Sequence, residues 1–278
     1  MSTGESENTL KNWGFLIVLA LVWGSSFILI KRGLNVFSPG ELGAYRIVAA
    51  ATFLLPLSIP KVKNLKSHQI QNLILVGLVG SFIPAFLFAK AQTQLSSSLT
   101  GVLNALTPLF VVLVGAIFFN SKITRRNAIG LFIAFLGVVV LVTVKEGSGF
   151  GAFSDINAYA FFVILACTCY GFNLNLIKFR FVELKPVEIT AISLLMVLPA
   201  ALIYLMAGTQ FSYKLVSVEG AWTALGYVTL LGVLGTALAL IIFNMMVKTA
   251  SPVFASSVTY LIPIVAIMWG VWDGEVLL

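Results

Sequence analysis

Charged residues are scarce in this 278-residue chain: they make up 10% of it, whereas hydrophobic residues make up 59%. Ordinary soluble domains carry about 25% charged residues. A soluble fold of this length is therefore excluded, and we expect most of the surface to face lipid. The net charge of +7 comes from basic residues between apolar runs. That pattern fits loops beside lipid headgroups and argues against a nucleic-acid partner.

Residues suited to metal binding or acid–base chemistry are also few. The single histidine, His68, lies in a basic loop, and the two cysteines, Cys167 and Cys169, share one apolar run. Cysteines two positions apart on a helix point away from each other, so we expect no disulfide. An H-E-x-x-H motif and a G-x-x-x-x-G-K-[ST] loop are both missing from the sequence. We therefore expect no metal, no cofactor, no ATP-driven pumping and no enzymatic activity.

Long apolar runs dominate the chain. A helix needs about 20 apolar residues to cross a bilayer, whereas a barrel strand needs about ten with alternating polarity. The runs here have the helical length, so the predicted fold class is an all-α membrane protein, a polytopic bundle of about nine transmembrane helices. The predicted spans are 13–31, 39–59, 70–90, 98–119, 127–144, 156–177, 186–207, 221–245 and 253–272.

The basic residues predict the orientation of the chain. Loops on the side of the N-terminus carry about 11 lysines and arginines, and loops on the other side carry about 5. Cytoplasmic loops are the ones enriched in these residues. We therefore expect a cytoplasmic N-terminus, with a first span that is retained because its apolar run is too long for a signal-peptide core.

The chain also matches itself. A shift of 147 residues aligns the first part of each half, and a shift of 155 aligns the rest, which implies an eight-residue insertion near residues 209–219. The matched positions are Trp23 with Tyr170, Gly24 with Gly171, Lys31 with Lys178, Pro39 with Pro186, Glu41 with Glu188, Gly77 with Gly232, Gly80 with Gly235, Phe88 with Phe243, Leu106 with Leu261, Pro108 with Pro263 and Gly115 with Gly270.

The repeat has consequences for topology. The first unit, 13–144, has five predicted spans, so the second unit, 156–278, enters the membrane from the opposite side. The fifth span of the first unit maps to positions just past Leu278, and we expect the second unit to lack its last helix, which would be the tenth. Inverted repeats are common in secondary transporters, whose substrate site lies near the midplane where the repeats meet.

These motifs resemble the drug/metabolite transporter superfamily, specifically its EamA-type members with two five-helix repeats. The resemblance covers nearly the whole chain and rests on the stretches Ala20–Phe27, Tyr45-Arg46 and Leu106–Leu109, with Tyr170-Gly171 and Tyr260–Pro263 in the second half. It implies a bacterial inner-membrane exporter of amino acids or related compounds. The superfamily also includes sugar-nucleotide and triose-phosphate carriers, so other metabolite classes, organic acids and drugs stay open.

Arg46 is the most informative candidate site residue. A guanidinium at membrane depth costs about 2.5–3.5 kcal/mol on insertion scales, so it should face protein or a watery cavity. It either anchors an anionic group of a substrate or extends to the interface. Glu41 and Glu188 begin two spans, where the helix dipole favours acidic groups; a part in proton coupling is the alternative.

Other polar residues within apolar spans are either substrate ligands or helix-packing contacts. Prolines four residues after a polar residue free a backbone carbonyl and make Pro108 and Pro263 candidate hinges. Gln92 and Gln94 are weaker candidates, and a receptor or a channel is a weaker alternative function. The predicted partners are a small-molecule substrate, lipid and, as one candidate coupling ion, a proton. The predicted substrate-binding residues are Trp23, Ser25, Ser26, Arg46, Asn104, Thr107, Tyr170, Asn173, Asn175, Asn244, Thr259 and Tyr260.

Overall fold

The computed structural model describes residues 3–63, 65–125, 127–130, 132–133, 136–137, 158–181 and 183–274. Within these residues the regular structure is entirely helical, and eight helices are long and apolar enough to span a membrane. The chain is therefore a multi-pass membrane protein. The predicted fifth span, 127–144, falls mostly outside the described residues, so the count of nine is approximate. The eight spans are Leu10–Leu34, Pro39–Val62, Ser67–Ala91, Ser97–Phe119, Ala160–Arg180, Pro186–Ala207, Ala221–Thr249 and Pro252–Trp272.

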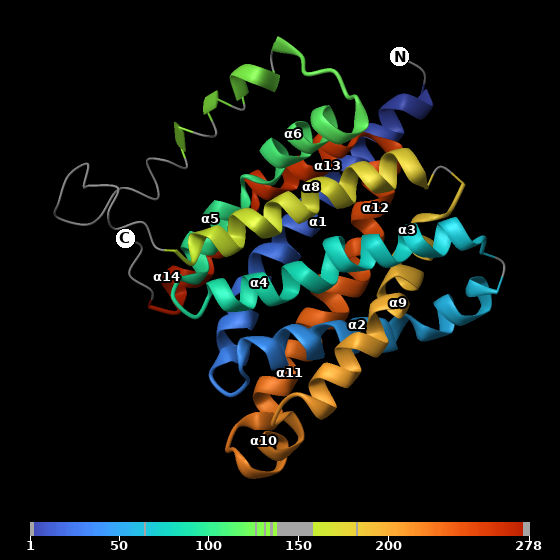
Figure 1. Cartoon of the computed structure of the whole chain (residues 1–278). Coiled ribbons are helices and arrows are strands. Elements are labelled where there is room, and N and C mark those ends of the chain that lie inside the picture. Colours follow the sequence, from blue (N-terminus) through green and yellow to red (C-terminus); the bar gives the residue numbers. More distant parts are fainter. Residues whose placement is uncertain are drawn as a thin grey trace.

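Several spans are divided into shorter elements (Figure 1). In chain order, the helices are α1 (Thr3–Leu34), α2 (Pro39–Val62), α3 (Ser67–Gly77), η1 (Leu78–Phe82), α4 (Ile83–Ala91), α5 (Ser97–Asn104), α6 (Thr107–Phe119), α8 (Ala160–Arg180), α9 (Pro186–Ala207), α10 (Phe211–Ser217), α11 (Ala221–Gly232), η3 (Val233–Leu238), α12 (Ala239–Thr249), α13 (Pro252–Ser256), η4 (Ser257–Tyr260) and α14 (Ile262–Trp272).

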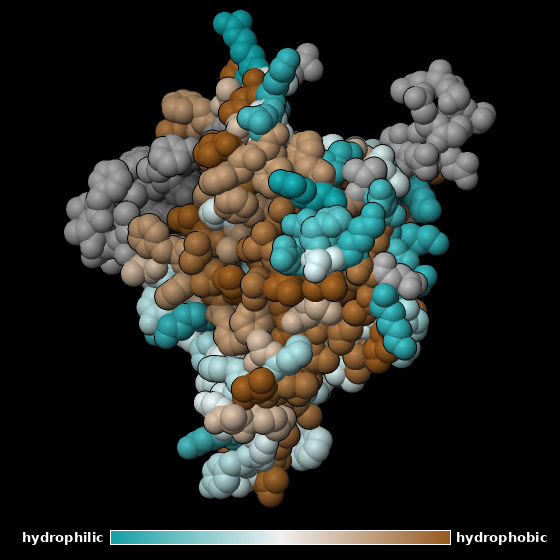
Figure 2. Space-filling view, turned by 45° about the vertical axis from the view of Figure 1, so that its right-hand side comes forward, coloured by the Kyte–Doolittle hydropathy of each residue, from teal (hydrophilic) through white to brown (hydrophobic). Residues whose placement is uncertain are grey.

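The surface has the polarity of a protein embedded in lipid. Figure 2 shows hydrophobic side chains over the middle of one face, with hydrophilic side chains gathered above and below them. Large apolar side chains such as Ile117, Ile203 and Met268 are more than half exposed. Soluble monomers rarely expose contiguous apolar patches of this kind, because water penalises them. The described helices thus present the belt that a bilayer requires.

The two predicted repeats have the same local irregularity. The segments η1 and η3 are both π-helical, and each interrupts a span after an equivalent glycine, Gly77 or Gly232. Single π turns inside α-helices are rare and frequently lie at functional sites. Their start positions, Leu78 and Val233, are related by the 155-residue shift of the sequence repeat. The repeat is therefore a repeat of structure, down to the helical geometry.

Close contacts between the halves are reciprocal. A Cβ atom on Gly80 would meet the side chain of Asn173 at 2.6 Å, and one on Gly235 would meet Ser26 Oγ at 2.8 Å. Ser26 and Asn173 are related by the 147-residue shift, as Gly80 and Gly235 are by the 155-residue shift. Each half therefore inserts a polar side chain against the π-helical glycine of the other. This exchange is what a pseudo-twofold axis between the halves produces.

The equivalent helices α2 and α9 are antiparallel neighbours. Glu41 at the start of α2 accepts a hydrogen bond from Lys214, beyond the end of α9, with an Nζ–Oε2 distance of 2.7 Å. Glu188 at the start of α9 pairs with Lys61 at the end of α2, with an Nζ–Oε1 distance of 3.3 Å. Since the two helices are equivalent yet run in opposite directions, the two repeats are inverted relative to each other.

Both glutamates also cap their own helices, which explains why these spans begin where they do. Glu41 accepts from the backbone N–H of Ser38 at 2.7 Å, and Glu188 accepts from that of Lys185 at 3.0 Å. A proline follows each cap, at the helical position where a missing N–H costs nothing. The acidic groups at these helix starts thus have the dipole-related role expected from the sequence.

Spans four and eight of the described residues are broken at their centres. The break between α5 and α6 falls at residues 105–106, and η4 separates α13 from α14. Pro108 and Pro263 are each the second residue of the new helix, where proline fits without loss of a hydrogen bond. The prolines therefore mark restarts of helices rather than simple bends, and their role as hinges stays a prediction.

Candidate functional site

A cavity of about 70 Å³ lies between the two repeats. A single water needs about 10–15 Å³ by the same measure, so the cavity accommodates a few waters or a small solute. Seven of the eight described spans contribute to its wall, which places it at the centre of the bundle. Its lining residues are Trp23, Ser26, Phe27, Ile30, Arg46, Gly80, Ser81, Phe88, Asn104, Thr107, Tyr170, Asn173, Leu174, Gly235, Thr236, Leu240, Phe243 and Thr259.

Most of this lining consists of equivalent positions from the two repeats. The shifts of 147 and 155 residues pair seven residues of the first half with seven of the second. These pairs are Trp23 with Tyr170, Ser26 with Asn173, Phe27 with Leu174, Gly80 with Gly235, Ser81 with Thr236, Phe88 with Phe243 and Asn104 with Thr259. The cavity therefore lies on the pseudo-twofold axis, where the sequence repeat placed the expected pocket.

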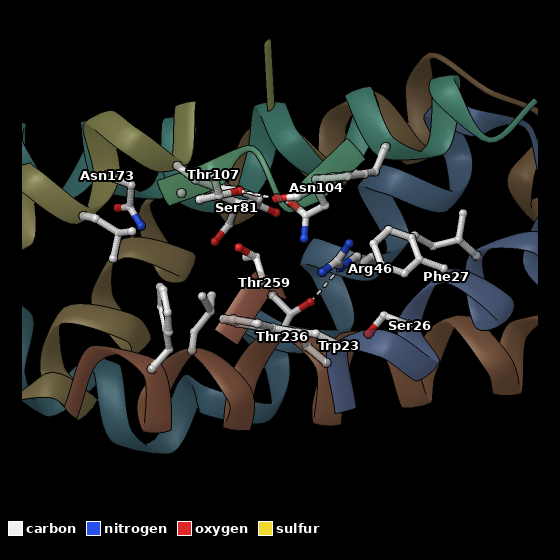
Figure 3. Close-up of a pocket in the computed structure, with 18 residues that line it drawn as sticks. Trp23, Ser26, Phe27, Arg46, Ser81, Asn104, Thr107, Asn173, Thr236 and Thr259 are labelled. Atoms are coloured by element: carbon white, nitrogen blue, oxygen red, sulfur yellow. Dashed lines mark hydrogen bonds between the residues drawn. The ribbon is translucent and has the colours of Figure 1, made fainter. Parts of the chain in front are cut away.

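Arg46 departs from this symmetry. Its equivalent in the second half is Ser193, which is buried outside the cavity lining and donates a hydrogen bond to the carbonyl of Thr190. Arg46 Nε donates to Thr236 Oγ1 at 2.7 Å. Figure 3 shows the Arg46 guanidinium pointing toward Thr236. Among the described residues that line the cavity, Arg46 is the one ionised side chain, so the cavity carries positive charge.

Aromatic rings form much of the remaining wall. Trp23 packs edge-on against Phe243, and Phe88 stacks on Tyr170, with ring centroids 4.8 Å and 6.0 Å apart. The indole N–H of Trp23 donates to the carbonyl of Gly235 at 2.9 Å. That bond satisfies the Trp23 donor, so this side chain offers a solute its ring face rather than its N–H.

Amides and hydroxyls supply the neutral polar groups of the cavity. Asn173 is 3% exposed, and its side-chain carbonyl oxygen has no hydrogen-bond partner among the described residues. A buried acceptor without a partner costs about 1–3 kcal/mol. Thr107 Oγ1 donates to the backbone carbonyl of Asn104 at 2.8 Å, so this carbonyl, expected to be freed by Pro108, is already occupied. The Asn173 oxygen is therefore the acceptor that most lacks a donor.

Eight of the twelve predicted substrate-binding residues line the cavity, and four lie elsewhere. Ser25 accepts a hydrogen bond from Trp269 Nε1 at 2.8 Å, across the α1–α14 contact. Asn175 donates to the carbonyls of Val111 and Gly171 between α6 and α8. Asn244 donates to Thr190 Oγ1 at 2.8 Å between α12 and α9, and Tyr260 is 53% exposed. The first three serve helix packing, the alternative that the sequence left open.

Several lining residues were not singled out as site residues from the sequence. Ser81 and Thr236 follow the repeated glycines Gly80 and Gly235 directly, so a repeat comparison that kept polar neighbours would have found them. Phe88 and Phe243 were visible as a repeated pair but look like ordinary lipid-facing or core phenylalanines. The other apolar lining residues lie among similar residues in apolar helices, and nothing in the sequence distinguishes them from their neighbours. They are Phe27, Ile30, Leu174 and Leu240.

A second, wider crevice of about 470 Å³ lies one helical turn away along α1 and α4. Its lining includes Lys31 and Gln92, which follow the cavity residues Ile30 and Phe88 on those helices. Gln92 Nε2 donates to the carbonyl of Phe27 at 3.0 Å. By the predicted orientation this crevice faces the outside.

Candidate metal ligands do not cluster within the described part of the chain. It contains no group of three or more histidine, cysteine, aspartate or glutamate residues that could hold a metal ion. Cys167 is buried, and its sulfur lies 3.8 Å from the backbone carbonyl of Asn104, one of the lining residues. The arrangement can hold a small polar or anionic molecule by hydrogen bonds and charge.

Comparison with known proteins finds relatives that are named as transporters. The profile of the EamA-like transporter family matches residues 12–143 and 157–276. An uncharacterized transporter of Archaeoglobus fulgidus is 30% identical over 132 residues, which is 48% of each chain. The match thus spans about half the length of that relative. An Escherichia coli protein named as an uncharacterized inner membrane transporter is 24% identical over 94% of this chain and 82% of its own.

One relative has a more specific name. A protein of Streptantibioticus cattleyicolor named "Probable terminal-alkyne amino-acid exporter" is 24% identical over 94% of this chain and 85% of its own. Among solved structures, one crystal structure matches with a TM-score of 0.66 at 19% identity, over 98% of this chain and 89% of the other. At that identity the likeness concerns the fold alone.

Proposed function

Because the chain belongs to the EamA-like transporter family, we propose that it is a secondary transporter that exports amino acids or related small polar metabolites across a bacterial inner membrane. The observation that carries the proposal is a central cavity built from equivalent positions of two inverted repeats, with one arginine in its wall. Two such repeats can exchange their local conformations, which closes one side of the cavity while it opens the other.

Arg46 gives the cavity its preference for charge. A buried guanidinium without a carboxylate partner is costly, and an anionic group on the substrate would compensate it. Among the described residues, the ion pairs of the protein join Asp273, Glu41 and Glu188 to lysines or arginines other than Arg46. We therefore assign the carboxylate of the substrate to Arg46.

The neutral polar groups suit the rest of an amino acid. The unpaired carbonyl oxygen of Asn173 can accept from an ammonium or amide group. Trp23, Phe88 and Phe243 would pack against a short side chain. The names of relatives with full-length similarity, one of them an amino-acid exporter, are consistent with this class.

Organic acids without an ammonium group are the second candidate. No aspartate or glutamate is among the described lining residues, so an ammonium in the cavity would lack an ionic partner. A sugar nucleotide fits less well, since its two phosphates would meet a single cation in a cavity of about 70 Å³. A gradient of the substrate alone or of protons would drive the transport.

Counterflow in proteoliposomes tests the proposal. Purified protein would be reconstituted into vesicles that are loaded with one unlabelled compound from a panel of L-amino acids and the corresponding 2-oxo acids. Uptake of the same compound in labelled form would then be measured without ATP. We expect saturable uptake of at least one compound, reduced at least tenfold in Arg46→Gln, because the anionic group would lose its ionic partner.

Ser193→Ala is the matched control, since Ser193 occupies the equivalent position in the second repeat but does not line the cavity. Its uptake should stay within about twofold of the wild type. A strict requirement for ATP, or equal uptake by Arg46→Gln and the wild type, would contradict the proposal. Elution of each variant as a monodisperse peak in detergent separates loss of transport from loss of folding.

A further inference from the structure

The orientation of Arg46 depends on one hydroxyl group. A guanidinium has five N–H donors in a planar fork, and its position decides where its two terminal nitrogens point. Arg46 makes one hydrogen bond within the described part of the chain, from Nε to Thr236 Oγ1 at 2.7 Å. The terminal nitrogens, which are the pair that grips a carboxylate with two parallel bonds, are left for another partner.

Thr236 is itself held in place by the π-helical turn. Its hydroxyl donates to the carbonyl of Leu231, five residues earlier, at 3.2 Å. A hydroxyl has a single hydrogen, so once that hydrogen is used on Leu231, only lone pairs face Arg46. Thr236 is 2% exposed, and its β-branched side chain is restricted at χ1, so the hydroxyl has few other orientations.

The first repeat has a hydroxyl at the equivalent position, but no arginine beside it. Ser81 is the equivalent of Thr236 and lies in η1, the equivalent π-helical segment. It lines the same cavity, but the residue equivalent to Arg46 is Ser193. The hydroxyl in η3 therefore has Arg46 as a partner, whereas the hydroxyl in η1 has no arginine at the equivalent place.

We propose that Thr236 is a positioning residue for anion recognition: fixed by Leu231, it accepts the Arg46 Nε–H and turns the two terminal nitrogens of the guanidinium toward the centre of the cavity (Figure 3). The inference rests on the proposed function in one respect, that Arg46 binds the anionic group of the substrate. It adds that the π-helical turn of the second repeat determines the direction in which this group is bound.

Chemical protection of Arg46 tests this role without knowledge of the natural substrate. The purified full chain in detergent would be treated with phenylglyoxal, an arginine reagent, with increasing concentrations of sodium acetate as the anionic probe. Mass spectrometry of the peptide that contains Arg46 gives the concentration of acetate that halves its modification. We expect acetate to protect wild-type Arg46, and sodium chloride at equal ionic strength to protect it much less.

The variants separate positioning from folding. In Thr236→Val, which keeps the shape and loses the hydroxyl, the half-protecting acetate concentration should rise about tenfold, as expected when a hydrogen bond to a charged group no longer orients the fork. Thr236→Ser should restore it to within about twofold of the wild type. Ser193→Ala, which removes a buried hydroxyl outside the cavity lining, should leave it unchanged. Each variant must elute as a monodisperse peak.

The outcomes distinguish the anion site at Arg46 from the positioning role of Thr236. Equal protection of Arg46 in Thr236→Val and in the wild type would overturn the positioning role while it leaves Arg46 as the anion site. An equal rise in Ser193→Ala and Thr236→Val would also overturn it, because a general disturbance of helix packing would then explain both. Failure of acetate to protect wild-type Arg46 would refute the anion site and the role of Thr236 together.

Discussion

The two halves of the cavity wall differ at one decisive place. Seven pairs of lining residues obey the repeat, whereas the arginine of the first repeat has a buried serine, Ser193, as its counterpart. The comparison separates two properties of the cavity: its symmetric frame comes from the repeat, and its charge comes from a residue that breaks the repeat. Under the proposed function, the paired positions would provide a frame with two interchangeable conformations, and the unpaired Arg46 would give that frame its preference for anionic groups.

The largest expected effect concerns the glycines at which the repeats touch. A Cβ atom on Gly77 would overlap the backbone carbonyl of Ser193, whereas one on Gly232 would meet the carbonyl of Arg46 at 2.9 Å. We expect Gly77→Ala to lower stability by about 1–3 kcal/mol and Gly232→Ala to lower it less, because its neighbours need to move less. Thermal unfolding in detergent, followed by tryptophan fluorescence, measures both.

Gly226→Ala is the control for those variants, since no atom lies within 4 Å of the added Cβ. Its midpoint should stay at or slightly above that of the wild type, because alanine favours the helix. Equal midpoints for Gly77→Ala and Gly226→Ala would show that the halves do not pack as closely as described.

An intermediate effect is expected at the two ion pairs that join α2 to its neighbours: Glu41 with Lys214 of α10, and Lys61 with Glu188 of α9. The Glu41 side chain is 2% exposed and that of Glu188 is 18% exposed. We expect Glu41→Gln to destabilise the protein by about 1–2 kcal/mol, because Lys214 then lies partly buried without its partner. Glu188→Gln should cost about 0–1 kcal/mol, as for exposed pairs. Unfolding in 0.1 M and 1 M salt compares them, and the reverse order would contradict the comparison.

The smallest expected effect on stability is the difference between replacing Trp23 and replacing its counterpart Tyr170. Trp23→Phe removes the hydrogen bond to Gly235 and should cost about 0.6–1.5 kcal/mol, the range for polar contacts within membranes. Tyr170→Phe should leave stability nearly unchanged, because no hydrogen bond of its hydroxyl is found within the described residues. Thermal melts followed by circular dichroism avoid the change in fluorescence. A larger loss of stability in Tyr170→Phe than in Trp23→Phe would contradict the stabilising role that we give to the Trp23 hydrogen bond.

The sequence predicted the helical class, all eight of the spans that the structure describes and the repeat, because these depend on long apolar runs and on spacing. It could not decide which polar residue of a helix faces the cavity. Ser25 and Ser26 differ by about 100° around the helix, and Asn173 and Asn175 by about 200°. The rotation of each helix about its axis is set by tertiary packing, so one member of each pair lines the cavity and the other contacts a neighbouring helix.

Thr236 shows a different limit of sequence reasoning. Its importance depends on a π-helical turn and on an arginine 190 residues away. Neither the turn nor the contact has a signature in the local sequence, since threonine is common in membrane helices. The repeated Gly-Ser and Gly-Thr pairs become informative only when the two halves are superposed in space.

The short helix α10 has a consequence for the balance between the conformations of the protein. It occupies the segment where the sequence shifts indicate eight extra residues, and it supplies Lys214 to Glu41. Two identical halves would give opposite-facing states of equal energy. An appendage that belongs to one half breaks this degeneracy at one membrane face. Under the proposed alternating access, a segment outside the transport path would thus be enough to set which way the empty carrier rests.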